Sequence, residues 1–287
     1  MTRASLGSPK LVILCVGRTE RNEFQHVLPA LQAWGNVLTA PTTHAGRDLL
    51  DHESLTPDLI VLVQSYPGEF AERQIDDIRR HAPLARLVAV LGTWCEGEMR
   101  SGTPWSGAVR IYWHQWTAHC HLEMERLRAG RESLWSLPPT ACDEERCLAN
   151  ATRKHKQGNG LVEICTEQVD VFDMLAAACH DRGFQTHWHR SHYEPPQDEP
   201  DVLLFDAARS VGFELTRFRR LHVRQDTVAI VLADFPRIAD SNRFLHAGAT
   251  TILSRPFFWD ELFWYFPGDP TPNAAGPQER IRAVGGT

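Results

Sequence analysis

Two side chains of opposite charge stand where predicted strands end in the second half of the chain. Asp206 closes the run Pro200-Asp-Val-Leu-Leu-Phe-Asp206, and Arg255 lies within Leu253-Ser-Arg-Pro-Phe257. A guanidinium can bind a carboxylate through two parallel hydrogen bonds. We therefore predict an ion pair between Asp206 and Arg255 that would hold this site in one state. The alternative is that Asp206 is a vestigial strand-end carboxylate without a role.

Aromatic and charged residues gather in residues 92–107 and in the strand that follows. The glycines of this segment, Pro104 and the lack of helical apolar spacing predict a long ordered loop. It would lie at the carboxyl edge of a sheet, where open α/β folds bind ligands. Aromatic residues and arginine are enriched at binding hot spots, but aromatic rings also fill cores. Partner surface and core packing therefore both remain open. The candidate binding residues are Trp94, Glu96, Glu98, Arg100, Trp105, Arg110, Tyr112, Trp113, His114 and Trp116.

Thiol and imidazole groups could in principle hold zinc. Those of the first half are Cys95, His114, His119, Cys120 and His121. Their spacing contains no Cys-x-x-Cys or His-x-x-x-His pair, and His119 and His121 would point to different sides of a helix. In the second half, His187 and His189 share one face of a predicted strand, which polar alternation marks as an exposed edge strand. The sequence therefore predicts neither a metal site nor a cofactor.

The elements that must position these groups form a repeat. Short apolar runs typical of buried parallel strands occur at Lys10-Leu-Val-Ile-Leu-Cys-Val16 and Gly160-Leu-Val-Glu-Ile-Cys165. Each run precedes a helical pattern, and Pro57-Asp-Leu-Ile-Val-Leu-Val63 matches Pro200-Asp-Val-Leu-Leu-Phe-Asp206. Strands that alternate with helices indicate a parallel sheet covered on both faces. We predict an α/β protein of two doubly wound, five-stranded, flavodoxin-like domains.

The domain boundaries follow from composition. Residues 9–130 and 159–266 carry the alternating pattern, whereas residues 131–158 contain Pro138-Pro139 and mixed charges, which suit an exposed linker. Residues 267–287 are rich in proline and glycine and poor in apolar groups. We expect this tail to be disordered.

The overall composition excludes several classes of protein. A chain of 287 residues with a net charge of −6 lacks a basic run that would attract nucleic acid. No apolar run is long enough to span a membrane, and the amino terminus does not resemble a signal peptide. The 7 cysteines are spread singly. We predict a cytoplasmic protein with reduced thiols, bound to neither membrane nor nucleic acid.

The second half resembles a response-regulator receiver domain over residues 159–266. The resemblance is carried by Pro200-Asp-Val-Leu-Leu-Phe-Asp206, Val231-Leu-Ala-Asp234, Ala247-Gly-Ala249 and Leu253-Ser-Arg-Pro-Phe257, in the family's order and spacing. In that family an aspartate that ends the third strand accepts phosphate, and acids after the first strand hold Mg²⁺. A threonine or serine ends the fourth strand, and a lysine precedes the proline after the fifth.

Both halves depart from this pattern. The resemblance maps Asp206 onto the acceptor, but Glu167 is the one acid after the first strand, Ala233 replaces the hydroxyl and Arg255 replaces the lysine. Phosphoryl transfer needs the metal and the cations as much as the nucleophile, so this site is incomplete. The first half matches more weakly, over residues 9–128. Its acceptor position is Val63, acids are missing after its first strand, and His114 stands where lysine is expected.

These departures predict a non-catalytic protein of bacterial two-component signalling or phosphorelay, made of tandem pseudo-receiver domains. It would bind a protein partner, and a homodimer is left open. The alternative is a small-molecule sensor or enzyme that uses the carboxyl-edge pocket of the first domain, with Glu96, Glu98, Arg100 and His114 as polar groups. Neither a paired nucleophile and base nor a glycine-rich phosphate motif is visible, which favours the first interpretation.

Overall fold

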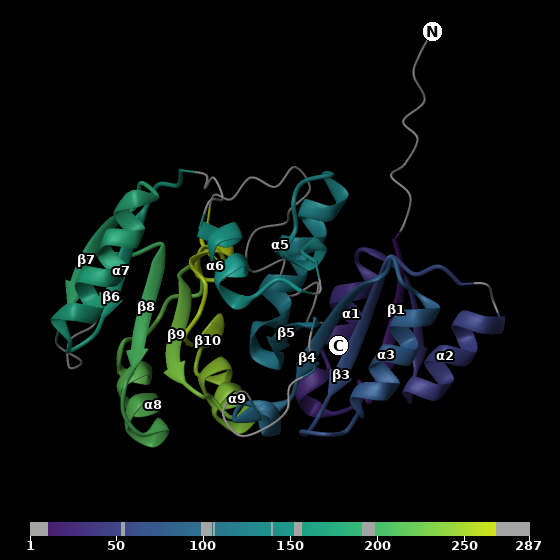
Figure 1. Cartoon of the computed structure of the whole chain (residues 1–287). Coiled ribbons are helices and arrows are strands. Elements are labelled where there is room, and N and C mark those ends of the chain that lie inside the picture. The colour runs from purple at the N-terminus through teal and green to yellow at the C-terminus, as the bar shows by residue number, and fades with distance from the viewer. Residues whose placement is uncertain are drawn as a thin grey trace, which may run out of the picture. The chain divides into compact units, whose positions relative to one another are not determined.

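The chain divides into two compact units, each with its own parallel five-stranded sheet (Figure 1). The computed structural model describes residues 11–52, 55–98, 105, 107–138, 140–151, 157–190 and 199–267. Unit 1 is Met1–Arg153 and unit 2 is Lys154–Thr287. The prediction of two doubly wound α/β domains is confirmed. No helix among the described residues has the length and hydrophobicity that a membrane crossing requires.

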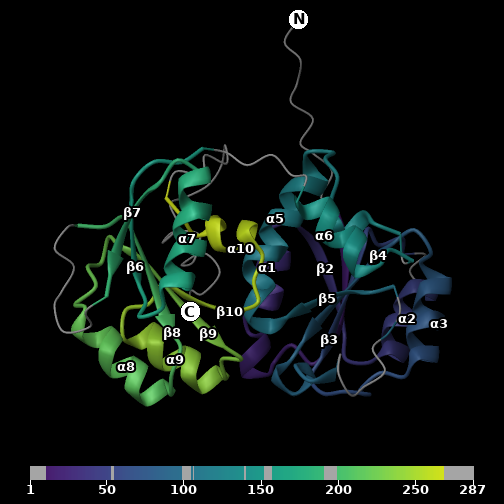
Figure 2. The same ribbon diagram turned by 60° about the vertical axis from the view of Figure 1, so that its left-hand side comes forward.

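Unit 1 has the strand order β2-β1-β3-β4-β5. Its strands are β1 (Leu11–Gly17), β2 (Gly35–Ala40), β3 (Leu59–Gln64), β4 (Arg86–Leu91) and β5 (Val109–Tyr112). Its α-helices are α1 (Val27–Gln32), α2 (Thr43–His52), α3 (Glu72–His81), α5 (Trp116–Arg128) and α6 (Asp143–Ala151), and its short 3₁₀ helices are η1 (Asn22–Phe24), η2 (Thr93–Cys95), η3 (Trp113–Gln115) and η4 (Leu134–Ser136). Helices α1 and α5 pack together on one face of the sheet, and α2 and α3 on the other (Figures 1 and 2).

Unit 2 has the order β10-β9-β8-β6-β7, which is the same order when its strands are counted from its own first strand. Its strands are β6 (Leu161–Cys165), β7 (Gln185–His189), β8 (Val202–Ala207), β9 (Val228–Asp234) and β10 (Thr251–Arg255). Its helices are α7 (Val169–Asp181), α8 (Val211–Arg220), α9 (Ile238–His246) and α10 (Trp259–Trp264). Every residue of the central strands β3 and β8 is buried, because helices cover both faces of each sheet.

The two sheets share their register as well as their strand order. In unit 1, Ile13 pairs with Leu59 of β3 and Val37 of β2. In unit 2, Val162 pairs with Val202 of β8 and Thr186 of β7. The repeated aspartates fix this register, since the carboxylates of Asp58 and Asp201 accept hydrogen bonds from the backbone N–H groups of Val12 (2.9 Å) and Leu161 (2.8 Å). Positions in one unit can therefore be compared directly with those in the other.

The segment after α5 differs from the exposed linker that we expected at residues 131–158. Leu134 and Trp135 of η4 are buried, and the Trp135 ring stacks on Trp116 with 5.9 Å between centroids. The carboxylate of Glu123 accepts hydrogen bonds from Ser133 Oγ (2.8 Å) and from the backbone N–H of Leu134 (2.7 Å). The first residues of the predicted linker thus belong to the core of unit 1, because two large apolar side chains follow α5. The tail prediction falls on residues 268–287, which lie outside the described residues.

All seven cysteines are free thiols. Cys15, Cys95, Cys120, Cys165 and Cys179 are buried, whereas Cys142 and Cys147 are exposed at α6.

Candidate functional site

Asp206 ends β8 at the carboxyl edge of unit 2, and both of its carboxylate oxygens are engaged. Its side chain is only 2% exposed. Thr166 Oγ1 donates a hydrogen bond to Oδ2 (2.7 Å), and Arg255 Nη1 donates one to Oδ1 (2.8 Å). The structure therefore brings Asp206 and Arg255 into the expected contact. It adds a hydroxyl partner, Thr166, which the sequence shows only as a threonine directly after the first strand of the unit.

Arg255 joins two strand ends. Its Nη1 binds Asp206 at the end of β8, and its Nε donates to Asp234 Oδ1 at the end of β9 (2.9 Å). The Asp234 side chain is 61% exposed, so this second contact is worth less than the buried one. Ala233 lies beside Asp234 in β9 and pairs in register with Ala207 and Ser254. Ala233 has no hydroxyl to offer Asp206. The Asp206 carboxylate instead accepts a hydrogen bond from the hydroxyl of Thr166, which lies on the other side of β8.

Glu167 faces cations and not a second acid. It contacts Arg209 (2.5 Å) and Arg217 (3.8 Å), and the second of these also binds both oxygens of Glu214. Burial raises the pKa of Glu214, and Arg217 counteracts this. Together with Gln168, Asp206 and Ala208, the side chains of Glu167, Arg209 and Arg217 line a cavity of about 210 Å³. Two acids therefore line this cavity, and both already bind cations: Glu167 contacts Arg209 and Arg217, and Asp206 contacts Arg255. A divalent cation that entered the cavity would compete with these guanidinium groups.

The corresponding strand ends of unit 1 carry different residues. Val63 occupies the position of Asp206, and Gly17 that of Thr166. Gly17 has a φ of 121°, and a Cβ built on it would lie 2.4 Å from the carbonyl oxygen of Val63. The close approach of β1 to β3 therefore requires glycine at position 17, which has no side chain to match the Thr166 hydroxyl of unit 2.

The polar candidates of unit 1 pair with one another. Glu98 forms an ion pair with Arg110, and Glu96 Oε1 lies 3.8 Å from His114 Nε2. Burial, followed by the nearby His26 and His119, lowers the pKa of His114 to about 3. Burial and the charge of Glu23 raise the pKa of Glu96. Tyr112 stacks on His114 with 5.8 Å between ring centroids.

The predicted tryptophan surface divides into buried and exposed residues. Trp105 is 6% exposed and donates from Nε1 to the carbonyl oxygen of Phe70 (3.2 Å). Trp113 and Trp116 are buried as well, so the packing alternative describes these three. Trp94 is 76% exposed and is the candidate that fits a partner surface. Arg100 lies outside the described residues, as do the other residues of the expected loop at 99–104 and 106.

The histidines and cysteines of unit 1 form no group of three metal ligands in the described parts of the chain. A different group does form, from Glu163, Cys165 and His189 of unit 2. We expected His189 to be exposed on an edge strand; β7 is an edge strand, but His189 is buried against Glu163. The signal that could have found this group is Glu163 itself, a charged residue inside an otherwise apolar strand run.

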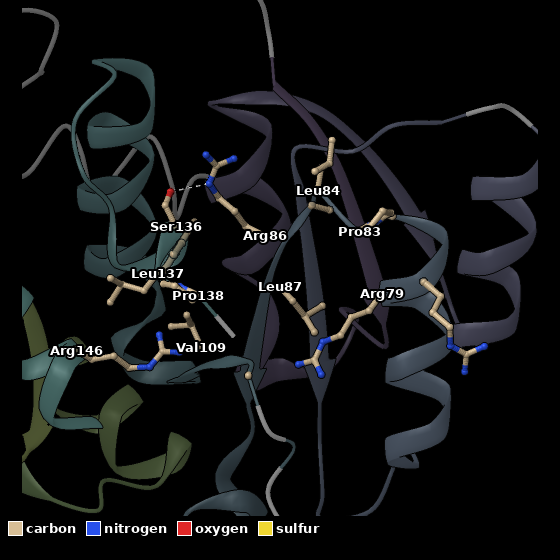
Figure 3. Close-up of a pocket in the computed structure, with 15 residues that line it drawn as sticks. Arg79, Pro83, Leu84, Arg86, Leu87, Val109, Ser136, Leu137, Pro138 and Arg146 are labelled. Carbon is tan, nitrogen blue, oxygen red and sulfur yellow. Dashed lines mark hydrogen bonds between the residues drawn. The ribbon is translucent and has the colours of Figure 1, made fainter. Parts of the chain in front are cut away.

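A cavity of about 630 Å³ lies at the opposite, amino edge of unit 1 (Figure 3). Arg79, Arg86 and Arg146 line it together with apolar residues such as Leu87 and Val109. Arg86 is held by Ser136 Oγ (2.9 Å), and Arg79 lies 3.5 Å from Asp76. Two of these cations therefore already have partners, and the cavity is remote from the strand ends that carry the polar groups described above.

Strand order and register define each unit as a receiver-like, doubly wound α/β domain. No protein-family model matches the chain, and no curated protein is significantly similar to it. Among solved structures, a response regulator from Thermotoga maritima is 18% identical and aligns over 44% of this chain and 98% of its own, with a TM-score of 0.32. The E. coli RcsC C-terminus, with a linker region and a phosphoreceiver domain, is 14% identical over 98% and 96%, with a TM-score of 0.32. An NAD-dependent formate dehydrogenase from Staphylococcus aureus is 9% identical over 96% and 92%, with a TM-score of 0.24.

Proposed function

We propose that this chain is a non-catalytic signalling protein whose two receiver-like units regulate a protein partner without being phosphorylated. The observation that carries the proposal is the Asp206 carboxylate, which is occupied by Thr166 on one oxygen and Arg255 on the other. A carboxylate that serves as a nucleophile must present a free oxygen to the phosphorus. In unit 2 this would require the buried ion pair to open first, at the cost of leaving a buried charge without its partner.

The charges around Asp206 further support this proposal. Phosphoryl transfer relies on Mg²⁺ to neutralise charge on the transferred group. The acid nearest in position, Glu167, is paired with Arg209 and Arg217. Arg255 neutralises the Asp206 carboxylate itself, and does so before any phosphoryl group is present. We infer that Arg255 fixes unit 2 in a single state.

The experiment is to incubate the full-length protein with Mg²⁺ and acetyl phosphate, or with beryllium fluoride. We expect no phosphoryl adduct by mass spectrometry and no change in melting temperature. A chain that carries both Arg255→Lys and Ala233→Thr regains the lysine and the hydroxyl of the receiver pattern, though not the second acid, and serves as the matched variant. Phosphate found on the wild type and lost in Asp206→Asn would contradict the proposal.

The partner surface that we favour includes the exposed ring of Trp94. A sensor or enzyme at the carboxyl edge of unit 1 has weaker support, because Glu98 pairs with Arg110 and Glu96 lies beside His114.

A further inference from the structure

Three side chains of unit 2 with different metal-binding chemistry meet inside the protein. Glu163 and Cys165 lie on one face of β6, and His189 ends the neighbouring strand β7 in register with Cys165. Their ligand atoms all lie within 4.8 Å of one another. Glu163 and Cys165 are 0% exposed and His189 is 7% exposed. The group therefore combines a carboxylate, a thiol and an imidazole without access to bulk water.

Unit 1 shows what the fold normally places at these positions. By the shared register, Glu163, Cys165 and His189 correspond to Leu14, Val16 and Ala40, all buried in one hydrophobic cluster. Helix α2 covers them, since a Cβ built on Gly46 would lie 3.1 Å from Val16 Cγ2, 3.7 Å from Ala40 Cβ and 3.8 Å from Leu14 Cδ2.

Unit 2 thus carries residue types that bind metals at three core positions where unit 1 carries apolar residues. Packing alone does not require polar residues here, because the same fold uses leucine, valine and alanine at these positions in unit 1.

The exchange is costly unless something compensates it. Three buried atoms lack a hydrogen-bond partner among the described residues. They are the two carboxylate oxygens of Glu163 and the Nε2 atom of His189. The one close contact joins Glu163 Oε1 to His189 Nδ1, at 2.7 Å. A buried polar group whose hydrogen-bonding atoms lack partners destabilises an apolar interior. An ion pair of this kind leaves the second carboxylate oxygen and the outer ring nitrogen uncompensated.

We propose that Glu163, Cys165 and His189 bind a thiophilic divalent cation, and that this ion is Zn²⁺. Zinc takes sulfur, nitrogen and oxygen ligands together, in a tetrahedral arrangement. One thiolate and one carboxylate balance its charge of two, so the filled site is neutral and suits a buried position. Binding releases the proton of the Cys165 thiol to solvent as the zinc–sulfur bond forms. Three protein ligands leave the fourth position to a water molecule or a further group.

The three ligands belong to two neighbouring strands, since Glu163 and Cys165 lie in β6 and His189 ends β7. The ion would connect β6 to the edge strand β7, and its role would be to stabilise unit 2. This inference is independent of the proposed signalling role, which rests on the Asp206 carboxylate and its partners Thr166 and Arg255.

The experiment uses the full-length protein after treatment with a chelator and removal of the chelator. One equivalent of Zn²⁺ should bind, and the thermal transition of unit 2 should move to higher temperature, because an ion that binds only the folded state stabilises it. Co²⁺ serves as a spectroscopic probe of the same site. We expect a thiolate-to-cobalt charge-transfer band together with the visible bands of a tetrahedral complex.

Variants separate this site from adventitious binding. Cys165→Ser should abolish the charge-transfer band and weaken Zn²⁺ binding by more than about 100-fold, since loss of an outer-shell partner alone costs about 10–100-fold. Cys15→Ser, which removes a buried cysteine from the first strand of unit 1, is the matched control and should leave both unchanged. The triple variant Glu163→Leu, Cys165→Val, His189→Ala carries the residues of unit 1 and should fold without binding metal. No uptake by the wild type, or equal uptake by the folded triple variant, would overturn the proposal.

Discussion

At the scale of single residues, buried ionisable groups make stability depend on pH. Burial lowers the pKa of His114 to about 3, whereas the same side chain in the unfolded chain titrates near 6.5. Above about pH 6.5 neither state binds a proton at His114. As the pH falls from about 6.5 towards 3, His114 becomes protonated in the unfolded state but stays neutral in the folded state. Unfolding is therefore favoured in this window, and stability falls with decreasing pH.

We predict that His114→Gln removes this part of the pH dependence. Between pH 7 and pH 5 the free energy of unfolding of the wild type should fall by about 2 kcal/mol more than that of the variant. Urea denaturation monitored by circular dichroism at both pH values provides the measurement. His246→Gln replaces an exposed histidine and should keep the wild-type dependence. An equal fall in wild type and His114→Gln would show that His114 does not titrate on unfolding.

At the scale of elements, the segment from η2 to β5 contributes side chains in two directions. The Trp105 ring lies in the core and bonds Phe70, whereas the Trp94 ring of η2 faces solvent. Sequence patterns could not separate them, because a large aromatic ring is equally suited to a core and to an interface. The fold resolves the ambiguity for Trp105, which packs among the buried residues that cover β3 and β4.

Replacing the two rings should therefore have unequal effects. Trp105→Ala should lower the stability of unit 1 by about 3–5 kcal/mol, the usual loss for a buried large aromatic residue. Trp94→Ala should change it by less than about 0.5 kcal/mol, as exposed substitutions generally do. Denaturant titration of the two variants under the same conditions tests this. Similar losses in both variants would mean that Trp94 also packs against the protein.

At the scale of the whole molecule, the chain consists of one fold used twice with different interiors. The strands could be predicted, because each Pro-Asp pair precedes a long apolar run and the runs recur in the same order. The contact between Asp206 and Arg255 followed from their places at strand ends. The pairing of Glu163 with His189 did not, since residues 166–184 separate the two strands and no short turn sets their alignment. The predicted first domain was also too short. Pro138-Pro139 suggested a linker from residue 131 onwards, and this linker wrongly included the buried Leu134 and Trp135.

We predict that this difference in extent is measurable. A fragment of residues 1–153 should unfold cooperatively, and a fragment of residues 1–130 should be less stable by at least about 3 kcal/mol, because it lacks the buried Trp135 and Leu134. Trp135→Ala in the full-length protein should reproduce most of the loss. Equal stability of the two fragments would show that residues 131–138 do not contribute to the core of unit 1 and belong to the linker.

The distribution of thiols gives the native chain a single place for chemical labelling. Maleimides and similar reagents attack thiolates that solvent can reach. Burial raises the pKa of Cys15 and Cys179 to about 12, and five of the seven thiols are buried. The exposed pair, Cys142 and Cys147, sits at α6, close to where unit 1 ends. A fluorophore or spin label can thus be attached near the end of unit 1 without altering any residue.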